Sequence, residues 1–212
     1  MERRLPLFPL GLVLLPRMPL PLHIFEERYR VMIRRCLEEQ IEFGVLLSRG
    51  KQVESLGTLA RIDSVINRYD DGRLDILTVG TERIKVSEFH SDEAYLQGVV
   101  TSIRDEPSED SAGLESLALE AIASLEAFAE EVGYTLDRSV LKGLDFEELS
   151  FFIASTDVFS TDEKQKLLAL RDTAKRLRSV AAGLRRGVEQ RKQTEKIRKI
   201  IGEDQDITHL FN

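Results

Sequence analysis

The sequence predicts an α+β fold, in which a partly closed β-barrel is followed by a bundle of α-helices that ends in a long helix. Up to about residue 104, apolar residues recur with the period of two that is typical of β-strands. After a polar segment at residues 105–111, which holds the last proline, the period changes to that of α-helices. We therefore divide the 212 residues into a β subdomain at 1–106 and a helical subdomain at 107–212.

The prolines shape the first elements. They are concentrated at positions 6, 9, 16, 19 and 21, and proline both fixes φ and lacks the N–H that a strand ladder needs. Residues 5–8, residues 13–15 and a stretch that runs into His23 are therefore expected to be edge strands or strand ends. A helix is expected next, over Phe25–Glu39, because an apolar stripe recurs there with helical spacing. The stripe comprises Phe25, Tyr29, Met32, Ile33, Cys36 and Leu37.

Four strands are expected to follow without intervening helices, a pattern that favours a small barrel over a sheet with crossover helices. Between the second and third, Asp70–Gly72 predicts a hairpin with a type I′ turn, because Asp-Gly accepts the positive φ angles of that turn. The third strand is apolar on both faces over Leu74–Val79, so it is expected to be central. Beyond Gly80, polar residues such as Arg83 are expected to take over one face. The four strands are expected at Phe43–Leu47, Gly57–Tyr69, Arg73–Phe89 and Tyr95–Arg104.

Local signals mark the first helices of the second half. Gly133 is placed to end a strongly amphipathic helix, and Asp145, with Glu148 three residues later, can cap a short one. The apolar stripe of the amphipathic helix comprises Leu114, Leu117, Ala118, Ala121, Ile122, Leu125, Phe128, Ala129 and Val132.

The final helical region is expected to open with a capping box at Ser160–Glu163. Its apolar seam runs from Leu170 to Val188 with spacings of four and three, and this seam is expected to pack on the amphipathic helix before it. Gly183 and Gly187 are expected to kink the helix, because each glycine destabilises a helix interior by ~1 kcal/mol.

The composition indicates a cytoplasmic protein that does not enter a membrane. The basic start and the apolar run at residues 5–15 imitate a signal peptide, but Pro6 and Pro9 interrupt the run and no small-residue cleavage site follows. The run is also far shorter than the ~20 residues that a spanning helix requires. The one cysteine, Cys36, leaves no internal disulfide framework and lies on the buried stripe of its helix.

Charge is distributed unevenly along the chain. The net charge of −7 argues against a protein that coats nucleic acid with its whole surface. Residues 105–164 carry 3 basic and 16 acidic side chains, whereas residues 171–199 carry 11 basic and 3 acidic ones. Two interpretations are open: the basic helix lies against the acidic segment of the same molecule, or it meets an anionic partner.

No catalytic, cofactor or metal motif is present in the sequence. It lacks the Gly-x-x-x-x-Gly-Lys-[Ser/Thr] loop of P-loop ATPases, the Gly-x-Ser-x-Gly of hydrolases and the His-Glu-x-x-His of metalloproteases. His23, His90 and His209 have no ligand spacing, and His23 is expected to bond a backbone group at a strand–helix junction. We therefore expect no enzyme activity, no cofactor and no metal ion.

Three blocks of the sequence occur in the order found in a known family. The first comprises Leu5–Leu10, Leu14–Pro16 and Leu20–Tyr29, and Gly57–Ile62 and Gly72–Ile84 follow. Together they resemble the N-terminal substrate-binding domain of Lon proteases over roughly residues 5–200. The resemblance implies a PUA-like β pseudo-barrel with a helical bundle, and a non-catalytic role in recognising unfolded or tagged polypeptide. The ATPase and Ser–Lys protease modules of Lon have no counterpart in these 212 residues, so no catalytic residue is carried over.

Two sets of residues are candidates for binding. Apolar residues among the N-terminal prolines either form an exposed patch that binds polypeptide or simply close the barrel. Basic residues of the final helix are expected to project by about 20 Å beyond its apolar seam and to bind an acidic protein. RNA is the alternative partner for these basic residues, although no aromatic side chains alternate with them for base stacking. The oligomeric state is left open. The apolar set is Leu10, Leu12, Leu14, Met18 and Leu20, and the basic set is Arg185, Arg186, Arg191, Lys192, Lys196, Arg198 and Lys199.

Overall fold

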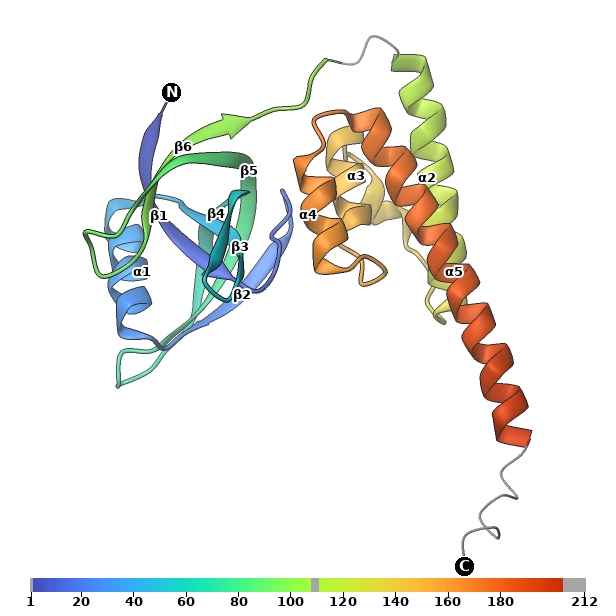
Figure 1. Cartoon of the computed structure of the whole chain (residues 1–212), viewed down its shortest axis with the longest axis horizontal. Coiled ribbons are helices and arrows are strands. Elements are labelled where there is room, and N and C mark those ends of the chain that lie inside the picture. Colours follow the sequence, from blue (N-terminus) through green and yellow to red (C-terminus); the bar gives the residue numbers. More distant parts are fainter. Residues whose placement is uncertain (1, 108–110, 204–212) are drawn as a thin grey trace, which may run out of the picture.

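The computed structural model describes residues 2–107 and 111–203. Five of the six described strands form a barrel-like ring that is not evenly round, and helices α2 to α5 form a bundle beside it (Figure 1). This is the α+β architecture that the change of sequence period predicts. In chain order the elements are β1 (Arg3–Leu10), β2 (Pro19–Ile24), α1 (Glu27–Glu39), β3 (Phe43–Arg49), β4 (Gln52–Arg68), β5 (Leu74–His90), β6 (Gln97–Ile103), α2 (Ser111–Glu131), the 3-10 helix η1 (Arg138–Leu141), α3 (Phe146–Ala154), α4 (Thr161–Ala169) and α5 (Thr173–Glu203).

The long strand β5 closes the ring. The strand order is β2-β5-β4-β3-β1-β6, and a further pairing joins β6 back to β5. One side of β5 bonds to β4, while the other side bonds to β2 over Leu74–Val79 and to β6 over Arg83–His90. The prediction that this strand is central is therefore confirmed, and β2 remains outside the ring as an edge strand.

The proline-rich pieces differ in part from expectation. β2 holds Pro19 and Pro21 at an edge, as predicted, but β1 is internal to the ring. Its residues Arg3–Pro6 pair antiparallel with β6, and its residues Leu7–Leu10 pair parallel with β3. Apart from Leu7, whose N–H also donates to the carbonyl of Leu96 over 2.8 Å, each half of β1 pairs on one side only, which leaves an open side where the missing N–H of a proline is tolerated. Residues 13–15 form no strand, so that part of the prediction is wrong.

The hairpin between β4 and β5 is present, but its turn type was predicted wrongly. The N–H of Gly72 donates to the carbonyl of Tyr69 over 2.9 Å, and the N–H of Tyr69 donates to the carbonyl of Arg73 over 3.0 Å. Gly72 has a φ of 84°, whereas Asp71 is not among the residues with positive φ. Because a type I′ turn requires positive φ at both central positions, this connection is instead a three-residue loop with glycine in the left-handed position.

Helix α1 confirms the predicted stripe except at its first member. The helix begins at Glu27, and Phe25 lies before it with 60% of its surface exposed. The stripe faces the barrel core, and burial raises the pKa of the Cys36 thiol to about 12. At neutral pH this thiol is therefore protonated and behaves as a small apolar group. The buried residues of α1 are Tyr29, Met32, Ile33 and Cys36.

The helix caps of the bundle are confirmed. The Asp145 side chain accepts from the N–H of Glu148 over 2.8 Å, the Ser160 hydroxyl accepts from the N–H of Glu163 over 3.3 Å, and each glutamate bonds back to complete a capping box. Gly133, with a φ of 83°, follows the end of α2. The box at Ser160 opens the short helix α4 and not the long one, because three residues separate α4 from α5.

The packing of α5 on α2 is confirmed. Ala121 and Leu125 of α2 share one buried core with Leu177, Ala181 and Leu184 of α5, and none of the five is more than 4% exposed. α5 is continuous from Thr173 to Glu203, through both glycines at which a kink was expected.

A buried ion cluster joins the barrel to the bundle. Asp105, just after β6, accepts a hydrogen bond from Arg176 of α5 over 2.5 Å and one from the Thr173 hydroxyl over 2.5 Å, and it also pairs with Arg83 of β5. Both guanidinium groups lie over the ring of Phe151, at 5.1 Å for Arg83 and 4.0 Å for Arg176. Arg83 alternates with the buried Ile84 and Val86 as predicted, and the bundle covers its side chain, which is 1% exposed. The division of the chain at residue 106 stays a prediction.

No helix within residues 2–107 and 111–203 combines the length and the apolar composition that crossing a bilayer requires.

Candidate functional site

The apolar candidates of the N-terminal stretch lie in the wall of the barrel. Leu14 is 4% exposed and belongs to the core that includes Phe8 and Tyr29. The other four members, half-buried against the same core, are Leu10, Leu12, Met18 and Leu20. This placement favours their role in closing the barrel, and their part in binding stays a prediction.

Two hollows of the bundle flank α5, on either side of the loop Thr156–Phe159 between α3 and α4. This loop packs against α5 at two glycines. A Cβ added at Gly183 would lie 2.2 Å from Cε1 of Phe159, and one added at Gly187 would lie 2.3 Å from Cγ2 of Val158. Such close contact is possible only where the helix has no side chain. The two glycines therefore serve packing.

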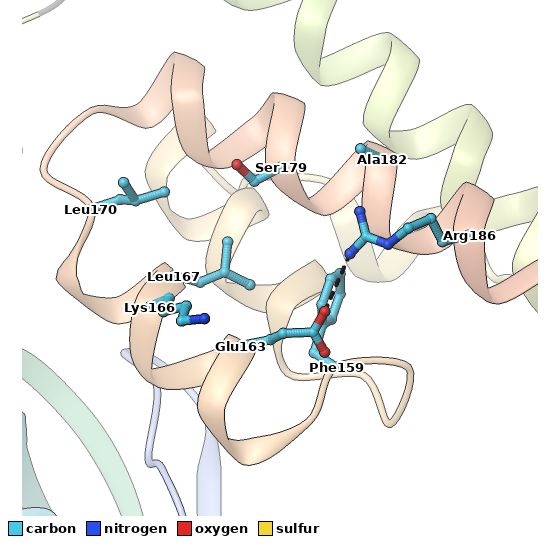
Figure 2. Close-up of a pocket in the computed structure, with 8 residues that line it drawn as sticks. All are labelled: Phe159, Glu163, Lys166, Leu167, Leu170, Ser179, Ala182 and Arg186. Carbon is cyan, nitrogen blue, oxygen red and sulfur yellow. Dashed lines mark hydrogen bonds and ion pairs between the residues drawn. The ribbon is translucent and has the colours of Figure 1, made fainter.

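The first hollow, the α4–α5 groove, has a volume of about 350 Å³ (Figure 2). Glu163 of α4 and Arg186 of α5 face each other across it and form an ion pair of 3.2 Å. These two opposite charges compensate each other, whereas Lys166, which also lines the groove, forms no ion pair in the described part of the chain. The groove is lined by Phe159, Glu163, Lys166, Leu167, Leu170, Ser179, Ala182 and Arg186.

The second hollow, the α2–α5 groove, is about twice as large, with a volume of about 740 Å³. It lies between the C-terminal end of α2, the loop before α4 and the middle of α5. Tyr134, just beyond α2, is 73% exposed at its edge. The apolar side chains that line it are Phe128, Val132, Tyr134 and Val158, and the other lining residues are Thr156, Asp157, Gly187, Gln190, Arg191 and Thr194.

The basic candidates of α5 divide into two groups. Arg185 pairs with Glu120 of α2 over 2.6 Å, and Arg186 pairs with Glu163, so these two charges are compensated inside the molecule. Beyond Val188, every described side chain of α5 up to residue 198 is exposed, and the helix projects past the rest of the bundle (Figure 1). In the described part of the chain, no ion pair is formed by Arg191, Lys192, Lys196 or Arg198. Lys199 falls in the last turns of α5, and its side chain lies outside the described part.

The histidines show no arrangement for metal binding. Within residues 2–107 and 111–203, no group of three or more His, Cys, Asp or Glu side chains could hold a metal ion. Nδ1 of His23 lies 2.5 Å from Oδ1 of Asp75, so the predicted backbone partner is wrong. Hydrogen bonds from His23 and from the Tyr69 hydroxyl lower the pKa of Asp75. His209 lies outside the described residues.

The residues of the α2–α5 groove were not predicted from the sequence. They come from three segments that lie tens of residues apart, the last turns of α2, the loop before α4 and the middle of α5. The one sequence signal for the groove is the pair Gly183 and Gly187. Glycines destabilise a helix interior, so two of them in one helix indicate that another segment packs closely against it.

A family model matches this chain over residues 4–186, that of the ATP-dependent protease La (LON) substrate-binding domain. The matched region contains the barrel and most of the bundle. The projecting part of α5, with Arg191 and Arg198, lies beyond it.

Curated relatives and solved structures agree with this match. The Lon protease of Desulfosudis oleivorans is 26% identical over 205 residues, covering 92% of this chain and 25% of the relative. Lon protease 2 of Herpetosiphon aurantiacus is 26% identical over 192 residues, covering 85% and 23%. The chain thus spans about a quarter of the length of these relatives.

Among solved structures, the Lon N-terminal domain protein from Xanthomonas campestris superposes with a TM-score of 0.65 at 28% identity, covering 85% of this chain and 98% of that one. The N-terminal domain of a Lon protease from the Mycobacterium avium complex superposes with a TM-score of 0.68 at 19% identity, covering 86% and 98%, which shows a shared fold.

Proposed function

Since the chain belongs to the ATP-dependent protease La (LON) substrate-binding domain family, we propose that it recognises unfolded or tagged polypeptide in the cytoplasm and processes none of it itself. The observation that carries the proposal is the α2–α5 groove, an open hollow with an apolar floor and a polar rim on the helical bundle. The family match covers a substrate-binding domain alone, which supports a role in recognition without catalysis.

The groove has the size and chemistry that an extended polypeptide requires. Its volume of about 740 Å³ falls in the usual range of ~300–1,000 Å³ for binding pockets. Phe128, Val132 and Val158 offer apolar surface for one or two side chains of an unfolded segment. Gln190 and Thr194 on the opposite wall can exchange hydrogen bonds with the unpaired backbone groups of such a segment. An unfolded chain presents both kinds of group along its whole length, whereas a folded protein buries or pairs most of them, so the groove favours unfolded chains.

RNA is the second candidate ligand, and the uncompensated cations of the projecting helix are the observation that favours it. Binding to single strands usually combines such cations with aromatic side chains on which bases stack. Tyr134 is the one aromatic residue with a largely exposed ring in the described part of the bundle. Polypeptide binding therefore accounts for more of the site.

Blocking the groove tests the proposal. A denatured and alkylated protein, labelled with a fluorophore, is titrated with the chain and followed by fluorescence anisotropy. Thr194→Trp places a large ring in the groove, whereas the matched control Gln193→Trp makes the same change on the neighbouring residue, which does not line the groove. Both positions are exposed, so neither change should unfold the protein. We expect Thr194→Trp to weaken binding at least ten-fold and Gln193→Trp to leave it unchanged. Equal binding by both variants would place the site elsewhere, and no binding by the unmodified chain would contradict the function.

A further inference from the structure

We propose that the α2–α5 groove and the projecting part of α5 together select polypeptide segments in which an apolar residue has two carboxylates on one side of it, about three residues apart. This inference rests on the proposed function, because it names the class of segment that the groove receives. It joins two features, the apolar floor of the groove and the uncompensated positive charge that continues from its rim.

The pairing of the basic side chains of α5 with acidic partners changes at the groove. Before it, Arg185 and Arg186 are held by Glu120 and Glu163. At the groove and beyond it, the described cations have no carboxylate partner among residues 2–107 and 111–203. An exposed cation attracts an acidic ligand most strongly when nothing else neutralises it. Compensation by acidic groups of the chain itself thus holds for Arg185 and Arg186, and it fails for the described cations at and beyond the groove.

Only some of these cations face the groove. Arg191 lines it, and Arg198 lies seven residues later, which is close to two full turns and therefore on the same face of the helix. Lys192 and Lys196 lie 100° or more around the helix from Arg191, so they point away from the groove. The groove therefore continues outward along a stripe with two guanidinium groups.

Acidic groups near this stripe reduce its charge without cancelling it. Asp157 is the acidic residue among those that line the groove. On the helix, Glu195 stands between Arg191 and Arg198, and Glu189 bonds to Gln193 on the far side. The guanidinium groups carry several donors in a fork that matches a carboxylate, so a bidentate contact with a ligand remains open to each of them.

The separation of the two arginines sets the spacing of the ligand. Seven residues of helix correspond to about 10 Å along the axis, and an extended peptide spans that length in about three residues. A segment with an apolar side chain on the floor of the groove would thus reach Arg191 with a neighbouring carboxylate and Arg198 with a second one about three residues further on.

Four labelled peptides test the selection. The first carries a leucine followed by two glutamates three residues apart, the second has glutamines in place of the glutamates, the third has serine in place of leucine, and the fourth has the two glutamates adjacent. We expect the first to bind about ten-fold more tightly than the second, the combined effect of two exposed ion pairs. The third and fourth should bind more weakly than the first. The advantage should vanish at about 1 M salt, where charges are screened over ~3 Å.

Two double variants locate the charges. Arg191→Glu with Arg198→Glu reverses the stripe, and Lys192→Glu with Lys196→Glu makes the same change in net charge on the opposite face of the same segment. We expect the first to abolish the preference for the acidic peptide and the second to preserve most of it. All four side chains are exposed, so the fold should persist in both, which circular dichroism checks.

The outcomes separate the two proposals. If the acidic and glutamine peptides bind equally well, the selection is wrong while the proposed function stands. If both double variants lose the preference equally, the effect is diffuse attraction and the stripe is not a site. If a single-stranded RNA displaces the acidic peptide and binds more tightly, the stripe serves RNA and the inference fails. If no peptide binds, the proposed function itself is contradicted.

Discussion

Replacing Asp105 with asparagine removes the charge at the centre of the joint between the barrel and the bundle, while it keeps the size of the side chain. In the native protein this carboxylate bonds to Arg176 and Thr173 and pairs with Arg83. The side chains of Arg83 and Arg176 are 1% and 0% exposed, so neither can turn to water when the Asp105 charge is lost, although Arg83 keeps a second carboxylate partner, Glu147, at 3.2 Å.

The size of the effect follows from this burial. Breaking a buried ion pair by removing one partner costs about 3–5 kcal/mol, because the remaining charge stays buried. The arginines keep other acceptors, since both donate to the carbonyl of Leu170, at 2.8 Å for Arg83 and 2.7 Å for Arg176. We therefore expect the free energy of unfolding to fall by about 3 kcal/mol, near the lower end of that range. This is a large part of the 5–15 kcal/mol that stabilises a typical domain.

Urea unfolding at neutral pH, followed by circular dichroism, measures this loss. Asp162→Asn is the matched control, because Asp162 of α4 also joins the two halves through Arg49 of β3, but its side chain is 69% exposed. We expect the control to unfold at nearly the same urea concentration as the unmodified protein. Equal losses in both variants would show that burial of the Asp105 cluster is not what holds the bundle on the barrel.

The pH dependence gives a second readout of the same cluster. Burial raises the pKa of Asp105, but hydrogen bonds from Arg176 and Thr173 and the charges of both arginines outweigh burial and hold the pKa below its usual range. A carboxyl group whose pKa is lowered by folding stabilises the protein above its unfolded pKa, and this stabilisation is lost as the pH falls through the folded pKa. The difference in unfolding free energy between the native protein and Asp105→Asn should therefore be full at neutral pH and shrink below about pH 4.

Four further outcomes are expected. In thermal unfolding, Gly183→Ala should lower the free energy of unfolding by about 1–3 kcal/mol, because the added Cβ would overlap the loop packed on α5. Gly11→Ala is the control and should change it little, because its Cβ would meet no atom within 4 Å. A chain ended after Val188 should keep the unfolding midpoint of the full chain, but it lacks Gln190, Arg191 and Thr194 of the groove, so its binding should weaken at both low and high salt. Unchanged binding at low and high salt would mean that the second half of α5 has no role. The purified chain with ATP and denatured casein should match the buffer blank in phosphate and peptide release, and turnover that disappears on a point substitution would contradict this. Limited proteolysis with mass spectrometry should find the first cut within residues 105–111, and a first cut inside β5 would contradict its central place in the ring.

Features of the fold that depend on neighbours in sequence could be predicted. The capping boxes at Asp145 and Ser160 and the stripes of α1 and α2 follow from spacings of three or four residues, and the structure contains them. The Asp71-Gly72 turn shows the limit of such signals, since the same dipeptide suits two loop lengths and the pairing of the flanking strands decides between them.

Features that depend on distant partners could not be predicted. Arg83 alternates with the apolar residues of β5, as the period of a strand requires. Nothing near it in sequence indicates that a bundle formed some eighty residues later will cover it. The same holds for the α2–α5 groove, whose walls come from three separate segments. The charge asymmetry of the chain was visible, but only the structure shows that Arg185 and Arg186 are compensated while Arg191 faces the groove.

The position of β1 in the ring has a consequence for the order of events on the ribosome. β1 bonds to β6, which ends at Ile103, so its first half has no strand to pair with until more than ninety further residues have been made. At synthesis rates of about 5–20 residues per second, this wait lasts about 5–20 s. The edge of β1 that later bonds to β6 is open to strands of other chains during this time. We therefore expect the time that β6 takes to arrive and close the ring to influence how much of the newly made protein aggregates.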